Sequence, residues 1–223
     1  MSNVIVWFHN DLRLGDNPAL VKAIESGNKI IPIYIWDEKD SDLHTGSAGK
    51  WWLHQSLDRL SNRIEELGNK LVLRKGDPKS ILQEFISQND VSKIFMNRRF
   101  ELQIIERDEG ILSQIDHEIT NGNLLFDPED IRTKQDKQYT VFTPFWKNCK
   151  MQTEPHEPLA IPSEIPAPDK FPESLSLDEM GLLPKIKWYE TFEKKWRPGE
   201  EEANRILVHF LKSEARKYGK QRN

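Results

Sequence analysis

Short runs of β-branched and aromatic residues alternate with helical stretches over the first 126 residues of the chain. The runs that favour strands are residues 4–8, 29–36, 70–75, 92–96 and 123–126. Strands that alternate with amphipathic helices are typical of a parallel sheet with crossover helices. The pattern therefore predicts an α/β fold, a Rossmann-like five-stranded parallel sheet with flanking helices.

Apolar residues at helical spacing predict four helices between these strands. Asn17 and Pro18 supply a cap and a proline at the first helical position of the first helix. The second helix is expected over residues 47–68, the third from residue 77, and the fourth over residues 104–119. Each helix presents an apolar stripe that can cover one face of the sheet.

The pattern changes after residue 126, where a polar stretch leads into a segment with prolines at irregular spacing. Such a composition predicts an extended linker. Further on, Pro198 and three glutamates favour a helix start, with acidic residues at the positive end of the helix dipole. We therefore expect an α/β domain over residues 1–130, a linker over residues 131–197 and a C-terminal helix over residues 198–223.

The C-terminal helix is predicted to carry one apolar face, made of Ala203, Ile206, Leu207, Phe210 and Leu211. Burying a large apolar side chain stabilises a protein by about 1.5–3 kcal/mol, so this face needs a partner. We expect self-association through this face, or disorder of the helix, rather than docking on the α/β domain. Removal of the chain from Pro198 onward should then leave the unfolding of that domain nearly unchanged.

Composition restricts the class of protein. Hydrophobic residues make up 37% and charged residues 30%, and no apolar run approaches the roughly 20 residues that cross a membrane. The start of the chain shows no secretory pattern, and the lone Cys149 fits a reducing compartment, so we expect a cytoplasmic protein with no membrane partner. The net charge of −4 argues against strong nucleic-acid binding, although basic residues outnumber acidic ones after Lys212.

Ligands of parallel α/β sheets bind beyond the carboxyl ends of the strands, so the loops there are the candidate sites. None of these loops carries a glycine-rich phosphate motif, which disfavours a dinucleotide or nucleotide-triphosphate site. Asp11, Arg13 and Asp16 are interpreted as loop scaffolding. His44 and His54 lack the partners that a metal site needs, so no metal site is predicted.

Several blocks of sequence then occur in an order that resembles one family. The opening VWFHNDLRLGDNPAL resembles the first block of DNA photolyases and cryptochromes, with His9 where an arginine is usual. The blocks WWLHQSL, NRRFE and YTVFTPFWKN agree in the same order, and WRPGEEEANRILVHFLKSEARKYGKQRN resembles the first helix of the family's flavin domain. The resemblance covers essentially the whole chain.

The resemblance implies two chromophores, an antenna pigment at the α/β domain and catalytic FAD in a helical domain downstream. Tyr218 matches a family tyrosine that contacts FAD, which would be an incomplete site here. For the antenna pigment, Gln103 stands where folate-binding relatives have asparagine, and Arg99 stands where deazaflavin-binding relatives have an acidic residue. His44, Lys50 and Gln103 are the candidates for the pigment pocket, and the pigment type, folate, deazaflavin or flavin, stays open.

The resemblance further implies that the chain is the N-terminal, light-harvesting part of a deoxyribodipyrimidine photolyase, a light-driven DNA-repair lyase, without its catalytic FAD domain. Damaged DNA would then be bound through that missing domain, and we expect the chain alone to lack FAD and repair activity and to bind nucleic acid weakly. The open alternatives are a stand-alone pigment-binding or protein-interaction module, a cryptochrome-type photoreceptor fragment, and half of a split enzyme.

Overall fold

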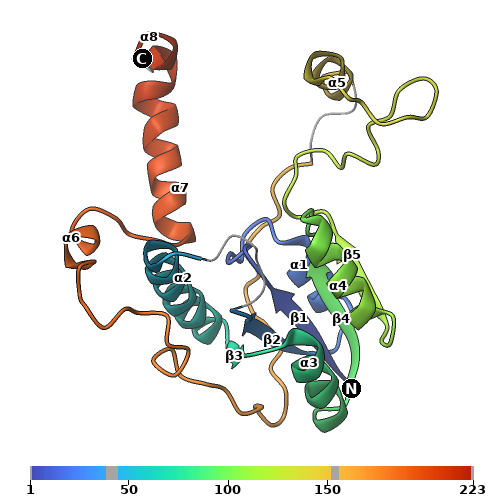
Figure 1. The fold of residues 1–223 in the computed structure, drawn as a ribbon, viewed down its shortest axis with the longest axis vertical. Coiled ribbons are helices and arrows are strands. Elements are labelled where there is room, and N and C mark those ends of the chain that lie inside the picture. The colour runs from blue at the N-terminus through green and yellow to red at the C-terminus, as the bar shows by residue number, and fades with distance from the viewer. Residues whose placement is uncertain (1, 39–44, 152–155, 222–223) are drawn as a thin grey trace.

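The structure is a computed structural model that describes residues 2–38, 45–151 and 156–221. Its centre is a five-stranded, all-parallel sheet in the order β3-β2-β1-β4-β5 (Figure 1). The strands are β1 (Asn3–Phe8), β2 (Lys29–Trp36), β3 (Val72–Lys75), β4 (Val91–Asn97) and β5 (His117–Thr120). The helices between them are α1 (Pro18–Glu25), α2 (Ser47–Glu66), α3 (Pro78–Gln88) and α4 (Leu102–Leu112). The predicted α/β fold, a Rossmann-like five-stranded parallel sheet with flanking helices, is confirmed.

Two hydrophobic cores form because successive side chains of a strand point to opposite faces of the sheet. On β1, Val4, Val6 and Phe8 pack with helices α1 and α2, while Ile5 and Trp7 pack with helices α3 and α4. All five of these side chains are at most 2% exposed. Such burial on both faces explains why β1 reads as an uninterrupted apolar run.

The helices begin where capping residues favour them. The Asn17 side chain accepts a hydrogen bond from the Leu20 amide and caps α1, with Pro18 at the first helical position. Asp77 caps α3 in the same way and accepts hydrogen bonds from the amide and hydroxyl of Ser80. These bonds from Ser80 hold the pKa of Asp77 below its ordinary value. The predicted starts of both helices are therefore confirmed.

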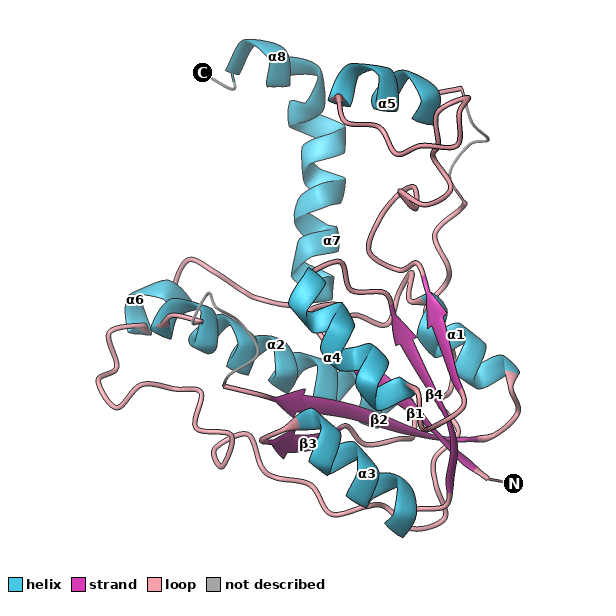
Figure 2. Ribbon diagram, turned by 45° about the vertical axis from the view of Figure 1, so that its right-hand side comes forward, coloured by secondary structure: helices cyan, strands magenta, loops and turns pink. Residues whose placement is uncertain are grey.

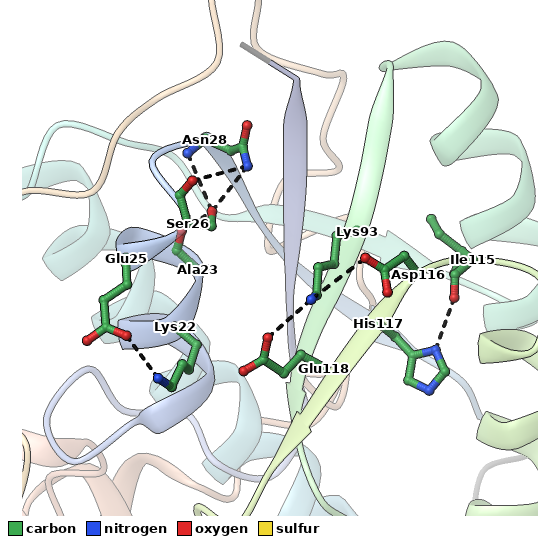
Figure 3. Close-up of polar contacts among 10 residues, drawn as sticks. All are labelled: Lys22, Ala23, Glu25, Ser26, Asn28, Lys93, Ile115, Asp116, His117 and Glu118. Carbon is green, nitrogen blue, oxygen red and sulfur yellow. Dashed lines mark hydrogen bonds and ion pairs between the residues drawn. The ribbon is translucent and has the colours of Figure 1, made fainter.

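The fifth strand differs from its prediction. It lies at His117–Thr120 rather than at residues 123–126, and the fourth helix ends at Leu112 instead of reaching residue 119. Figure 3 shows why this register is favoured: Lys93 of β4 lies between Asp116 and Glu118, at 3.7 Å and 3.2 Å. An edge strand buries little, so its sequence carries a weak apolar signal. The run at 123–126 is instead a surface loop.

The predicted linker follows the surface of the α/β domain and makes backbone hydrogen bonds with it. The amide of Ile30 donates to the carbonyl of Pro166, and the amide of Leu175 donates to the carbonyl of Leu73. Its buried apolar residues, Ile165, Met180 and Leu182, join the core on the α1 and α2 side. Two short helices, α5 (Phe142–Cys149) and α6 (Glu190–Glu193), interrupt it. The domain boundaries at residues 130 and 197 stay a prediction.

The C-terminal helix extends away from the α/β domain (Figures 1 and 2). It begins as α7 (Glu200–His209), passes through a π-helical turn (Phe210–Glu214) and a 3₁₀ turn (Ala215–Lys217), and ends in α8 (Tyr218–Gln221). Much of its predicted apolar stripe faces solvent, with Ile206 and Leu207 each 51% exposed and Leu211 60% exposed. Within the described ranges, no helix is long and apolar enough to cross a membrane.

Candidate functional site

A cleft of about 950 Å³ opens beyond the carboxyl ends of β1 and β2. The loop after β1, the last residues of β2, the first turns of α2, residues 158–161 and the start of α7 form its walls. A volume of this order can hold a drug-sized or cofactor-sized molecule. The position is where open parallel sheets bind ligands.

The floor of the cleft rests on a buried network of three polar side chains. Asn97, at the end of β4, donates hydrogen bonds to the carboxylate of Asp11 and to the side-chain oxygen of Asn17, the latter at 2.9 Å. Asp11 also accepts a hydrogen bond from the His9 amide at 2.9 Å. Asp11, Asn17 and Asn97 are at most 5% exposed. Their bonds hold the loop in place, so the interpretation of Asp11 as scaffolding is confirmed.

The start of α7 is bound to the same loop through one carboxylate. Glu200 accepts hydrogen bonds from the backbone amides of Leu14 and Gly15, each at 2.8 Å. A Cβ atom at Gly15 would lie 2.6 Å from a carboxylate oxygen of Glu200, so a larger residue there would require this carboxylate to shift. We call this pair of bonds the Glu200 contact. It corrects the expectation that the C-terminal helix makes no docking contact with the α/β domain, although the apolar stripe itself stays exposed.

Aromatic side chains form the wall of the cleft next to α2. Trp36 ends β2, Trp52 lies in the first turns of α2, and both line the cleft together with Tyr34. Trp52 is 44% exposed, whereas its neighbour Trp51 is 1% exposed. The ammonium group of Lys50 lies 5.8 Å from the centre of the Trp36 ring. Trp36 is 9% exposed, so Trp52 supplies most of the open aromatic surface of this wall, beside the positive charge of Lys50.

The face of the sheet toward α4 is occupied by charged side chains. The ring of His9 packs on Trp7, with centroids 4.4 Å apart, and the side chains of Arg99 and Arg107 lie near it. Burial of the ring, followed by the positive charges of Arg99 and Arg107, holds the pKa of His9 well below its ordinary value. Arg107 in turn donates two hydrogen bonds to Asp108, at 2.7 Å and 2.9 Å.

A smaller cavity of about 310 Å³ lies among β4, α4 and the loop at residues 127–129. Its rim holds Arg98, which pairs with Asp127 at 3.2 Å and with Glu129 at 3.1 Å. Because this cation is already neutralised, the cavity offers a weaker electrostatic attraction for an anionic ligand. The larger cleft is the better candidate site.

Lys50 is the one predicted residue of the pigment pocket whose side chain the structure describes. Lys50 lies beside the cleft through its contact with Trp36, whereas His44 lies outside the described residues. Gln103 belongs to α4, but its side chain lies outside what the structure describes, so its place in the pigment pocket stays a prediction. Tyr218 lies in α8, is 54% exposed and packs its ring on Phe210.

Three residues of the site escaped sequence reasoning. Trp36 could have been found because it is the last residue of a buried strand, at the carboxyl edge. Trp52 is half exposed beside the buried Trp51, and its place in the cleft depends on tertiary structure. Glu200 lies far from Gly15 in sequence, and no local pattern links them. Among the described residues, no group of acidic, histidine or cysteine side chains could hold a metal ion.

Comparison with known proteins assigns the family. The sequence profile of the family described as DNA photolyase matches residues 4–168. The chain belongs to the DNA photolyase family. It is 39% identical over 214 residues to the deoxyribodipyrimidine photo-lyase of Agrobacterium fabrum, covering 93% of this chain and 44% of that protein. It is 29% identical over 228 residues to Cryptochrome-2 of Arabidopsis thaliana, covering 97% of this chain and 37% of that protein.

Solved structures agree with this assignment. The class III photolyase from Agrobacterium tumefaciens superimposes with a TM-score of 0.88 at 37% identity, over 95% of this chain and 45% of that one. An archaeal photolyase from Sulfolobus tokodaii, described as holding two FAD molecules, shares the fold with a TM-score of 0.73 at 22% identity. The chain thus corresponds to the N-terminal part of a photolyase and spans less than half the length of these relatives.

Proposed function

We infer that this chain is the light-harvesting module of a DNA photolyase and that an antenna pigment binds in the cleft beside α2. Photolyases bind an antenna pigment and FAD and act on damaged DNA. The observation that carries the proposal is the aromatic wall of Trp36 and Trp52 in a cleft of about 950 Å³ at the carboxyl edge of the sheet. A planar pigment would gain stacking contacts there.

The residues present fit such a pigment. Trp52 offers an exposed ring for stacking, and the Lys50 ammonium group lies close enough to neutralise an acidic group of the pigment. The alternative position for a pigment is the crevice between β1 and β4, where the strand order reverses. His9 and Arg99 lie there, in the space that a pigment would need. We therefore favour the α2 side of the sheet over that crevice.

The pigment, when bound, would absorb light and transfer the excitation energy to the catalytic flavin. The chain's own residues have the task of fixing its orientation and excluding water. The Glu200 contact supports this task because it holds the start of α7, which supplies Ala203 and Leu207 to the cleft wall. A wall that moved would change the orientation of the pigment.

The test is a titration of the full chain with four probes: FMN, FAD, methenyltetrahydrofolate and a deazaflavin, followed by pigment fluorescence. We expect one of them to bind and the Trp52→Ala variant to bind it about tenfold more weakly, because removal of an aromatic stack costs about 0.5–1.5 kcal/mol. Trp146→Ala is the matched control, since Trp146 on α5 is 40% exposed and is not among the described residues that line the cleft. Failure of all four probes, or equal weakening in both variants, would contradict the proposal.

The fit for FAD as a catalytic cofactor is poor. Its one expected contact in this chain, Tyr218, is half exposed and packs only on Phe210 among the described rings. We predict that the purified chain retains no FAD at Tyr218 after desalting and shows no light-dependent repair of thymine dimers. Stoichiometric FAD that is retained by the parent chain, but not by Tyr218→Phe or Tyr218→Ala, would contradict this prediction.

A further inference from the structure

A second exposed surface of the chain lies in the linker, outside the cleft. Trp188, Phe192 and Trp196 lie on and beside α6 and are 37%, 37% and 55% exposed. Basic residues are interleaved with them in sequence and are all exposed: Lys185, Lys187, Lys194, Lys195 and Arg197. We call these three aromatic and five basic residues the linker platform. No residue of it belongs to the described lining of the cleft.

The aromatic rings of the linker platform are anchored on α2. Phe192 packs edge-on against the buried Trp51, with ring centroids 5.7 Å apart, and Trp196 packs against Trp52 at 6.1 Å. Trp188 packs on Phe192 at 5.3 Å. Figures 1 and 2 both show α6 beside α2 at the outer side of the molecule. The rings are therefore held in place on one side while part of each stays open to solvent.

The charge of the linker platform is opposite to that of the whole chain. Five basic residues face only two acidic ones, Glu190 and Glu193, between residues 185 and 197, whereas the chain carries a net charge of −4. Within the described ranges, the four lysines take part in no ion pair. Unpaired cations on an otherwise acidic protein mark a surface for a polyanion.

Open aromatic rings beside unpaired cations are the features with which proteins bind single strands of nucleic acid. Bases stack on the rings, and the lysines contact the phosphates. A duplex hides the faces of its bases and would use only the charges. A membrane surface would favour an amphipathic helix, but α6 has only four residues.

We propose that the linker platform binds single-stranded DNA. The occupant is DNA because the chain belongs to the DNA photolyase family, and it is single-stranded because the rings need unstacked bases. This site has its own lining residues and meets the pigment cleft where Trp196 packs on Trp52. It adds to the weak nucleic-acid binding expected from the sequence a stacking contribution that salt does not remove.

The test measures fluorescence anisotropy of a labelled oligothymidylate of about 12 nucleotides with the full chain. Trp188→Ala should weaken binding about tenfold, which corresponds to the removal of one stacked base. Trp188 is preferred over Trp196, because Trp196 touches Trp52 of the cleft. In Lys194→Glu/Lys195→Glu, the slope of log affinity against log salt should fall by about 0.7 for each phosphate that is no longer bound.

Matched variants keep the test specific. Trp146→Ala removes a tryptophan of similar exposure beside Lys150. Lys212→Glu/Arg216→Glu reverses two positive charges, as the Lys194→Glu/Lys195→Glu variant does, but on the C-terminal helix. Both controls should bind like the parent chain, and equal weakening in them would overturn the proposal. If Trp188→Ala does not fold, the Lys194→Glu/Lys195→Glu variant still tests the proposal, because both of these side chains are exposed.

The choice of ligand decides the remaining outcomes. Duplex DNA of the same length should bind more weakly than the single strand, and equal binding would overturn the stacking argument. Tighter binding of oligouridylate would assign the surface to RNA and overturn the assignment to DNA. Binding to phosphatidylserine vesicles but not to oligothymidylate would assign it to a membrane surface instead.

Discussion

At the scale of single residues, Glu200 carries the contact between the C-terminal helix and the α/β domain. Its carboxylate accepts hydrogen bonds from two backbone amides. Hydrogen bonds to a charged acceptor are stronger than those between neutral groups. We predict that Glu200→Ala lowers the free energy of unfolding in urea by about 2 kcal/mol. Glu201→Ala is the control, because Glu201 is 69% exposed at its side chain and pairs with Arg63 on the surface. Equal stabilities of the two variants would contradict a role for the Glu200 contact.

We expect His9 to make the stability of the chain depend on pH. Its pKa is lowered in the folded state, so the unfolded state binds more protons below the ordinary histidine pKa. The resulting loss in the free energy of unfolding is absent above about pH 6.5. It grows as the pH falls toward the pKa of His9 in the folded state, by up to about 1.4 kcal/mol per pH unit. We predict that the chain loses stability from pH 7.5 to pH 5.5 more steeply than His9→Gln does. Parallel decreases in both proteins, measured by urea unfolding, would show that His9 does not titrate in this way.

At the scale of elements, the sequence predicts what local chemistry determines. Asn17 and Asp77 cap their helices as expected, and the buried strands β1, β2 and β4 are close to their predicted limits. The edge strand β5 was misplaced because an edge strand buries little and its partner, Lys93, is set by tertiary pairing. The same holds for the cleft: Trp36 follows from the end of a strand, whereas the contribution of α7 depends on Glu200, far away in sequence.

The Glu200 contact also changes the prediction for the C-terminal helix as an element. From the sequence, deletion of the chain from Pro198 onward was expected to leave the α/β domain nearly unchanged. In the structure Pro198 is buried and Glu200 binds Leu14 and Gly15. We now predict that this deletion lowers the midpoint of thermal unfolding at least as much as Glu200→Ala does. A smaller decrease in this midpoint than in Glu200→Ala, measured by calorimetry at the same pH, would contradict the prediction. It would show that the helix strains the loop.

At the scale of the whole molecule, α2 connects the two surfaces proposed for this chain. Its Trp52 lines the cleft and also packs on Trp196 of the linker platform. The parallel sheet determines where the cleft forms, and the linker then returns to α2 and places its aromatic residues against it. Both surfaces therefore rest on one helix, although the ligands proposed for them differ in chemistry.

The exposed face of the C-terminal helix affects the behaviour of the whole chain in solution. Ile206 and Leu211 are 51% and 60% exposed, and each would stabilise an interface by about 1.5–3 kcal/mol if buried. The Glu200 contact fixes only the start of α7, so this face stays available to a second copy. We predict concentration-dependent dimers in sedimentation velocity, and their absence in Ile206→Glu/Leu211→Glu. Lys212→Glu changes charge on the same helix but removes no apolar surface, so it should dimerise like the parent chain. A parent chain that stays monomeric at every concentration tested would contradict this prediction.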